Sequence, residues 1–548
     1  MSGPLPFSLA GLDVRQLLDN SEALAFLHRE ELQNFISRGK QEIEAFEAEI
    51  LPLRMQLLAA DARLESLKSN LGVAMHILAP INLLPDELLH RIFRYICRGF
   101  WISSSSSRTP AHSLLQVCRR WHSIVMTSPT LWDSIHIDPA LLPGANRIAP
   151  AERFQAFIKR FVKKSGSSLI SVHFFLEQNQ RSQEDVYLAL EELIPTSNRW
   201  FHLEIIEELN PSGIDLNSDR FQPIHHNLTS LETLTIGYFP TASTILEDAP
   251  RLHSLRIVNP VAEPMYIVNL HPAMVRIPWH QLVHLTCEGM LARNILSFAR
   301  ASPNLEVLCI EDCMQPALPI GQSQVSMPRL RSLSVTRMWS PMDVVSREPM
   351  DITDDLLLFF ETFIAVKLET LILCLSDHDF RMRNILIDVA SFTNFVTAAS
   401  SSLTVLSLSM IPILPEDLIE TLKVLTRLET LSISFVKENR STETLYYASY
   451  HGNLSTAFLD AFHSNDKPIL IPCLQYLKLG FISLEEGLRD EALAAMIQWR
   501  YRNSRSLRFV DISLCNHMYS LGALEVFRSL KRDGLGISLE GIKGLVDL

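Results

Sequence analysis

A short hydrophobic pattern, Leu-x-x-Leu-x-apolar, recurs along most of the chain after residue 165. Apolar and polar positions alternate at the end of each copy, which predicts one short strand with a single buried face. One such strand cannot bury its leucines alone, but stacked neighbours share a continuous core. The region 165–548 is therefore predicted to be an α/β solenoid in which parallel strands line a concave face and helices lie outside.

The first five clear copies begin 21, 30, 23 and 25 residues apart, and later steps are longer, with inserted loops such as 437–450. The short steps match a leucine-rich repeat, which predicts a horseshoe. The clear copies are Leu231/Leu234/Ile236, Leu252/Leu255/Ile257, Leu282/Leu285/Cys287, Leu305/Leu308/Ile310, Leu330/Leu333/Val335, Leu368/Leu371/Leu373, Leu403/Leu406/Leu408, Leu428/Leu431/Ile433, Leu474/Leu477/Leu479 and Leu507/Val510/Ile512; fainter ones are Leu169/Val172/Phe174 and Trp200/Leu203/Ile205.

Helices that end at a proline are expected before several strands. The prolines stand in Ala249-Pro250, Ser302-Pro303 and Met327-Pro328. A last helix is predicted over Leu521–Lys531, followed by a last strand over Leu535–Leu539.

A helical arm is predicted over residues 21–76, after a flexible segment 1–20. From Gln41 the apolar residues alternate three and four apart, as in a coiled-coil seam. They are Ile43, Ile50, Leu57, Leu64 and Leu71 at one position and Phe46, Leu53, Ala60 and Leu67 at the other, flanked by Glu47, Glu49, Arg54, Asp61, Arg63 and Lys68. Proline removes a backbone donor, so Pro52 predicts one helix ending near Ile50 and a second beginning there. Two interpretations follow: a dimeric coiled coil, or a hairpin whose partner face comes from Leu24, Leu27, Phe35 and Ile36.

A second helical segment is predicted over residues 77–138. It opens with Leu84-Pro85-Asp86-Glu87-Leu88-Leu89 and continues with Ile92, Phe93 and Ile96 at helical spacing. The proline and the two acidic residues suit the first turn of a helix. A serine loop follows at Ser103–Ser107, and one further helix is predicted from Leu114 to Val125. Ser128-Pro129 ends that helix, and Leu131-Trp132 follows as an aromatic anchor. A linker and first helix occupy 139–164.

Three blocks of this segment, Leu84–Leu88, Val117–Trp121 and Pro129–Trp132, closely resemble the F-box pattern. The resemblance implies an all-α F-box that binds the Skp-family adaptor and, through it, a cullin and a RING protein. The implied adaptor-binding residues are Leu84, Pro85, Glu87, Leu88, Ile92, Phe93, Leu115, Val117, Cys118 and Trp121. The loop 98–111 is longer than is usual in that family. The heptad arm ahead of this segment and the repeats behind it also resemble the large fungal F-box families.

Composition narrows the function. Lys and Arg number 49 against 61 Asp and Glu, a net charge of −12, which speaks against binding to nucleic acid or an anionic membrane. No secretory signal or membrane span is found, and the eight cysteines lack a CxxC pair, which predicts reduced thiols and a location in the cytoplasm or nucleus.

A target protein is expected to bind the concave strand face. The candidates are Glu232, Arg256, Glu306, Arg331, Glu369, Glu429, Lys478 and Arg508. No motif for catalysis, a phosphate loop or zinc is found, so neither an enzyme nor a metal site or cofactor is predicted. Two polar clusters are predicted to be a solvent loop, Asp377-His378-Asp379, and a helix cap, Asp351–Asp355. A third, His225-His226, lies before a strand and has no partner in reach by sequence.

The sequence thus favours a substrate-recognition subunit of a cullin ubiquitin ligase. The alternative is a repeat scaffold, with or without the adaptor, that has no role in ubiquitin transfer.

Overall fold

The fold was analysed in a computed structural model. It describes residues 29–97, 110–137, 149–176, 191–207, 219–237, 244–259, 271–274, 276–314, 324–339, 360–374, 389–411, 413–434, 453–463, 468–484, 488–514, 518–541 and 544–546. The chain divides into two units, Met1–Leu89 and His90–Leu548. Within the described ranges no helix is both long and apolar enough to cross a membrane.

The first unit is dominated by one helix, α3 (Arg29–Leu78), followed by the 3₁₀ turn η1 (Pro80–Leu83). The expected break near Ile50 is wrong, because α3 continues through Pro52. The proline removes one hydrogen bond, and the alanines, leucines and glutamates on both sides have high helix propensity. The hairpin interpretation is also wrong for the described residues, since Ile36 lies on the same helix as the seam. Leu24 and Leu27 lie outside the described residues.

Helix α4 (Asp86–Cys97) begins directly after Pro85, whose carbonyl accepts the N–H groups of Leu88 and Leu89. The expected single second helix is two, α5 (Pro110–Leu115) and α6 (Arg119–Thr127). The backbone is extended at Cys118, between them, and its Sγ accepts the N–H of Trp121, which caps α6. Helix α6 ends at Ser128 as expected, and η2 (Pro129–Leu131) follows. The serine run lies outside the described residues.

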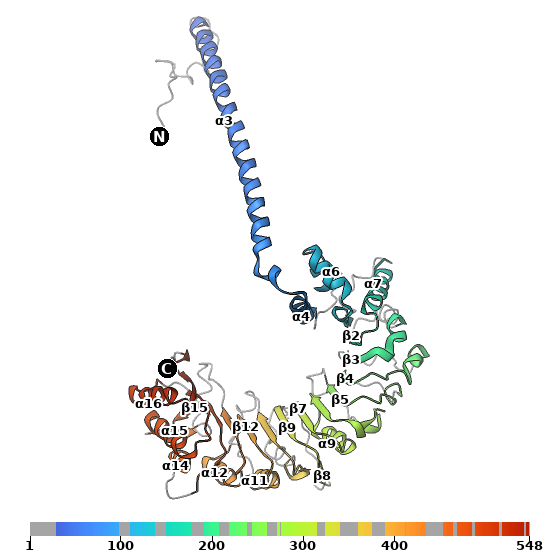
Figure 1. Ribbon diagram of the computed structural model, residues 1–548, viewed down its shortest axis with the longest axis vertical. Helices are drawn as coiled ribbons and strands as arrows, with labels where there is room; N and C mark the ends of the chain where they lie inside the picture. Colours follow the sequence, from blue (N-terminus) through green and yellow to red (C-terminus); the bar gives the residue numbers. More distant parts are fainter. Residues whose placement is uncertain are drawn as a thin grey trace. The chain divides into compact units, whose positions relative to one another are not determined.

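The second unit contains a sheet with 16 strands among the described residues. Neighbours along it are parallel except for the last pair, and in Figure 1 the helices follow its outer side. In order they are β1 (Ser134–Ile137), β2 (Ile170–Leu176), β3 (Trp200–Glu207), β4 (Thr233–Gly237), β5 (Ser254–Val258), β6 (His284–Glu288), β7 (Val307–Met314), β9 (Ser332–Trp339), β11 (Thr370–Cys374), β12 (Val405–Ser409), β13 (Thr430–Ser434), β15 (Tyr476–Leu484), β16 (Phe509–Leu514), β17 (Gly536–Gly541) and β18 (Gly544–Leu545), with β14 (Asn453–Leu454) beside β15.

The register stacks the repeated apolar positions into continuous buried rows. Leu234 pairs with Leu255, and Ile236 with Ile257, and the same alignment continues from β2 to β16. These residues are buried, whereas the residues between them form the opposite face of the sheet, which we call the inner face. The parallel solenoid expected from the repeats is therefore the observed arrangement of the second unit.

The segments between strands are more varied than expected. Helix α9 (Ala292–Ala301) ends at Ser302 as predicted, but turns precede Pro250, and the strand β8 (Val325–Ser326) precedes Pro328. The other helical segments are α7 (Ala149–Ser165), α11 (Val389–Ala398), α12 (Pro415–Lys423), α14 (Thr456–Phe462), α15 (Asp490–Ser504), η5 (Ile194–Arg199), η6 (Asp219–Ile224), η8 (Pro272–Met274) and η9 (Trp279–Gln281); β10 (Phe363–Ile364) pairs with β8.

Both ends of the sheet differ in detail from expectation. The sheet begins at Ser134, within the range expected to be all-helical and ahead of residue 165, because β1 pairs with β2. The predicted last helix and strand are confirmed as α16 (Leu521–Arg532) and β17, and β18 then adds an antiparallel strand. The inserted loop 437–450 lies outside the described residues.

Candidate functional site

Helix α4 exposes a row of large apolar side chains. Leu88 is 44% exposed, Ile92 38% and Ile96 37%, and their spacing places them on one face of the helix. Tyr95, next to them on the helix surface, is also exposed. A folded chain rarely leaves such a row in water unless something covers it, so this face of α4 is a candidate binding surface.

The other residues expected to bind the adaptor differ in exposure. Pro85 and Glu87 are exposed and Leu84 is half-buried; in the second unit Val117 is exposed, while Leu115, Cys118 and Trp121 are half-buried. Phe93 does not fit that role, because it is fully buried. Its ring lies 4.7 Å from the Trp121 ring, so Phe93 and Trp121 hold α4 and α6 together.

The residues expected to bind a target occupy two rows. Arg256 and Lys478 lie inside strands β5 and β15, on the inner face. The other six, Glu232, Glu306, Arg331, Glu369, Glu429 and Arg508, come one residue before a strand rather than within it, which corrects the expected placement. Backbone hydrogen bonds nevertheless join them from repeat to repeat, as from Arg331 N–H to Glu306 O and from Glu369 N–H to Arg331 O.

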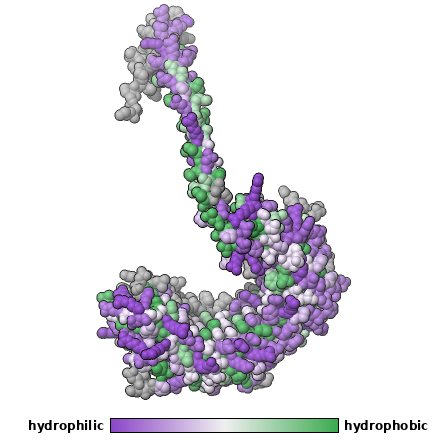
Figure 2. Space-filling model, viewed as in Figure 1, coloured by the Kyte–Doolittle hydropathy of each residue, from purple (hydrophilic) through white to green (hydrophobic). Residues whose placement is uncertain are grey.

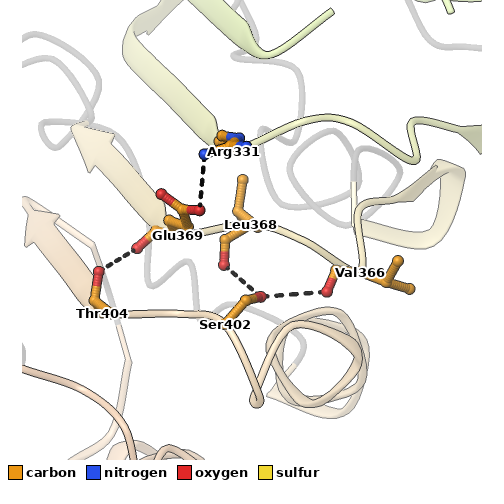
Figure 3. Close-up of polar contacts among 6 residues, drawn as sticks. All are labelled: Arg331, Val366, Leu368, Glu369, Ser402 and Thr404. Atoms are coloured by element: carbon orange, nitrogen blue, oxygen red, sulfur yellow. Dashed lines mark hydrogen bonds and ion pairs between the residues drawn. The ribbon is translucent and has the colours of Figure 1, made fainter. Parts of the chain in front are cut away.

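Several charges in these rows lie beside an opposite charge on a neighbouring repeat. The Arg331 guanidinium lies 3.5 Å from the Glu369 carboxylate, and Thr404 donates to the Glu369 carbonyl (Figure 3). Ser402, two residues before Thr404, donates to the carbonyls of Leu368 and Val366. These hydrogen bonds fix the repeat of β12 against the preceding repeat of β11. Arg331 and Glu369 are exposed, so their pair adds little stability but remains available to a ligand.

Arg256 is the centre of a second charged group. Its guanidinium bonds to Glu288 at 2.5 Å and lies 3.7 Å from Glu311, on strands β6 and β7. The hydrogen bond that Arg256 donates to Glu288, together with the nearby carboxylates, holds the pKa of Arg256 above its ordinary value. Lys478 similarly lies 3.8 Å from Asp511.

A histidine cluster at the start of the inner face was not anticipated from the sequence. His136 and His173 stack with ring centroids 3.9 Å apart, and His202 lies 4.9 Å from His173. Glu204 accepts a hydrogen bond from His173 at 2.5 Å, and His202 bonds to Thr233. These residues occupy polar positions of β1, β2 and β3, in the faint first repeats. Their proximity could be recognised only once the register of the three strands was known.

Burial keeps two histidines of this cluster, His136 and His202, uncharged. Burial, followed by repulsion from His173, lowers the pKa of His136 to about 3 and that of His202 to about 4. Burial alone would raise the pKa of Glu204, but the hydrogen bond from His173 and the neighbouring imidazoles outweigh it and hold that pKa below its ordinary value. The cluster therefore places the Glu204 carboxylate beside two imidazoles, His136 and His202, that are neutral at neutral pH.

Among the residues that the structure describes, two groups of side chains have donor atoms close enough to hold a metal ion. One is His173, His202 and Glu204; the other is His225, His226 and Asp248. The expectation that His225 and His226 have no partner in reach is wrong, because the turn before β5 brings Asp248 to both. In both groups a close contact between a histidine and the carboxylate accounts for the arrangement. Asp377-His378-Asp379 and Asp351–Asp355 lie outside the described residues.

In the comparison with known proteins, one segment of the chain matches a family model. Residues 81–138 match the family model described as F-box-like. No curated protein matches the chain. Among solved structures, one chain of the crystal structure of a TLR13–ssRNA13 complex is similar at 12% identity, with a TM-score of 0.31. That match covers 70% of this chain and 50% of the other, so the chain spans half the length of that protein.

Proposed function

We propose that this protein is the substrate-recognition subunit of an SCF-type cullin ubiquitin ligase. In this proposal the F-box-like segment binds the Skp-family adaptor, and a leucine-rich-repeat solenoid binds the target protein. The observation that carries the proposal is the F-box-like match over residues 81–138, within which α4 exposes Leu88, Ile92 and Ile96.

The division of labour follows from the two surfaces. An apolar helix face is suited to a tight, lasting contact with a folded partner. The inner face is polar and carries both signs of charge, as in the Arg256 and Arg331 groups, which suits selective recognition more than tight non-specific binding. Ubiquitin transfer would take place on other subunits, with this chain raising the local concentration of the target.

Adaptor binding is the first measurement. The full-length chain would be co-expressed with a Skp-family adaptor and purified through a tag on the adaptor. The wild type is expected to co-purify, whereas Leu88→Glu and Ile92→Glu should weaken binding by about tenfold or more each, because each places a charge in an apolar contact. Both side chains are exposed, so the fold should survive both changes.

The matched control is Arg91→Glu, which adds the same side chain to an exposed position of α4 outside the apolar row. It should bind like the wild type. Failure of the folded wild type to bind the adaptor would refute the proposal. Adaptor binding without recruitment of a cullin would instead favour the scaffold without a ligase role.

A further inference from the structure

Helix α3 carries an apolar seam that nothing in the described part of the first unit covers. Figure 2 shows hydrophobic residues along its length. The first row of the seam is Ile36, Ile43, Ile50, Leu57, Leu64, Leu71 and Leu78, and the second is Gly39, Phe46, Leu53, Ala60, Leu67 and Ala74. The large apolar residues of both rows are between 42% and 76% exposed. A 50-residue helix with such a seam needs a partner helix.

We propose that α3 pairs with α3 of a second copy of this chain in antiparallel orientation. In the proposed register the numbers of facing seam residues add up to 117, so that Leu57 of one copy faces Ala60 of the other. The pairing covers the seam from Gly39 to Leu78 in both copies, roughly 60 Å of helix. This inference does not depend on adaptor binding.

Side-chain size supports the antiparallel pairing. It places a large residue opposite each small one: Ile43 opposite Ala74, Leu78 opposite Gly39, and Leu57 opposite Ala60. The other layers pair Ile50 with Leu67, Leu53 with Leu64, and Phe46 with Leu71. A parallel pair would place each residue opposite itself, so that Gly39, Ala60 and Ala74 would leave three poorly filled layers.

The charges beside the seam support the same orientation. In an antiparallel pair the residue after each second-row position faces its counterpart on the other helix. In this register Arg54 faces Asp61, and Glu47 faces Lys68, each twice by symmetry. The other flank brings Gln56 to Arg63 and Glu49 to Asn70, so no like charges meet there.

A parallel pair would be opposed by its charges. It would bring Glu42 of one copy beside Glu47 of the other, and Arg63 beside Lys68, with only Glu49 and Arg54 attracting each other. An antiparallel register shifted by one heptad in either direction also fails, because like charges meet: Arg54 faces Arg54 in one and Asp61 faces Asp61 in the other. A shift of two heptads toward the N-terminus restores the attraction through Glu47 and Arg54 but leaves Leu78 without a partner.

The association state of the full-length chain and its charge variants tests the proposal. Light scattering over a wide range of concentration should show a dimer. Glu47→Lys and Lys68→Glu should each raise its dissociation constant by about tenfold, because each turns two attractions into two repulsions. The double variant Glu47→Lys/Lys68→Glu should restore the wild-type value. Glu44→Lys, on the outer side of α3, is the control and should have no effect.

The alternatives predict other results. In a parallel dimer Glu47→Lys and Lys68→Glu would each tighten association, since each removes a like-charge pair. In the register shifted by two heptads only Glu47→Lys would weaken it, because Lys68 would face the neutral Gln33. A wild type that is monomeric throughout would overturn the proposal, as would tightening by either variant.

Cross-linking of the unmodified side chains provides a second, independent test of the register. Carbodiimide coupling of a mixture of isotopically heavy and light chains should join Lys68 of one copy to Glu47 of the other. Lys68 also bonds to Glu65 of its own helix at 2.8 Å, and that link serves as the internal control for reactivity. If Lys68–Glu65 links form and mixed heavy–light Lys68–Glu47 links do not, the proposed register is wrong.

Discussion

His136 stacks on His173 with their rings 3.9 Å apart and nearly parallel, at an interplanar angle of 5°. The first lies on β1, at the end of the F-box-like match, and the second on β2, the first strand after it. The backbone joins the same two strands, since Ser171 N–H donates to Asp133 O. The end of the F-box-like segment is therefore the first strand of the solenoid, and residues 110–137 are fixed on the array rather than tethered to it.

Acid is expected to destabilise this junction. Unfolding returns His136, 6% exposed, from a pKa of about 3 to its ordinary value near 6.5, so the unfolded chain takes up a proton that the folded chain does not bind. Stability contributed by the neutral imidazole is thus present above pH 6.5 and is lost as the pH falls toward 3. At pH 5 the loss is about 2 kcal/mol for this residue.

The pH dependence of thermal unfolding checks this expectation. His136→Phe keeps a ring in the stack but cannot be protonated, so its unfolding midpoint should fall less between pH 7 and pH 5 than that of the wild type. His253→Phe, at an exposed position before β5, should leave the wild-type slope unchanged. An unchanged slope in His136→Phe would show that this imidazole does not titrate on unfolding.

Two substitutions on α4 should differ strongly in their effect on stability. Phe93→Ala removes a fully buried ring that packs on Trp121, so it should lower the free energy of unfolding by about 3–5 kcal/mol. Leu88→Glu changes an exposed side chain and should alter it by only about 0.5 kcal/mol. Chemical denaturation of both variants measures the difference, and similar losses would mean that Leu88 is covered within the chain itself.

The buried charge of Arg500 is expected to be replaceable. Burial lowers its pKa to about 10, and its guanidinium bonds to the carbonyl of Ile471 and lies 5.6 Å from the Phe462 ring. Its Nε and Nη1 atoms have no hydrogen-bond partner among the described residues. Arg500→Met removes the desolvated charge and keeps most of the volume, so stability should stay level or rise by about 1–4 kcal/mol.

The control for that replacement is Arg500→Ala, which leaves a cavity beside Phe462 and should lower the unfolding midpoint. If Arg500→Met were as unstable as Arg500→Ala, the guanidinium hydrogen bond to Ile471 would outweigh the desolvation of the charge.

Gly289 is expected to resist substitution for a conformational reason. It has a φ of +66°, and an added Cβ would lie 2.8 Å from the carbonyl oxygen of Asn259. Gly289→Ala should therefore lower the free energy of unfolding by about 1–3 kcal/mol. Gly72→Ala in α3, with no atom within 4 Å of its Cβ, should instead raise the helix content slightly. Equal effects of the two alanines on unfolding would contradict this account.

Local patterns predicted the strands of the repeats and the presence of helices ahead of them. The buried leucines of each repeat are spaced by the two-residue period of a strand, so Leu234 and Ile236 identified β4 without knowledge of its neighbours. The F-box-like blocks also depend on short-range spacing. The helix break predicted at Pro52 was wrong, because proline removes one hydrogen bond, whereas the length of α3 depends on the helix propensity of all its residues.

Relations between distant residues could not be predicted in the same way. His225 and Asp248 meet only because a turn returns the chain before β5, and Phe93 is buried only because α6 brings Trp121 to it. The exposure of α4 and the placement of the candidate target residues one position before their strands likewise required the fold.

The order of parts in this protein, a heptad helix, an F-box-like segment and a repeat array, follows from local sequence patterns alone. Each part is recognised by the spacing of its apolar residues, which is a local property of the chain. That spacing favours a helix or a strand, because it decides which element can bury those residues on one face. The grouping of polar side chains into sites depends instead on the folded arrangement of the strands. The parallel register brings His136, His173 and Glu204 together from strands far apart in sequence, and no local pattern records that alignment.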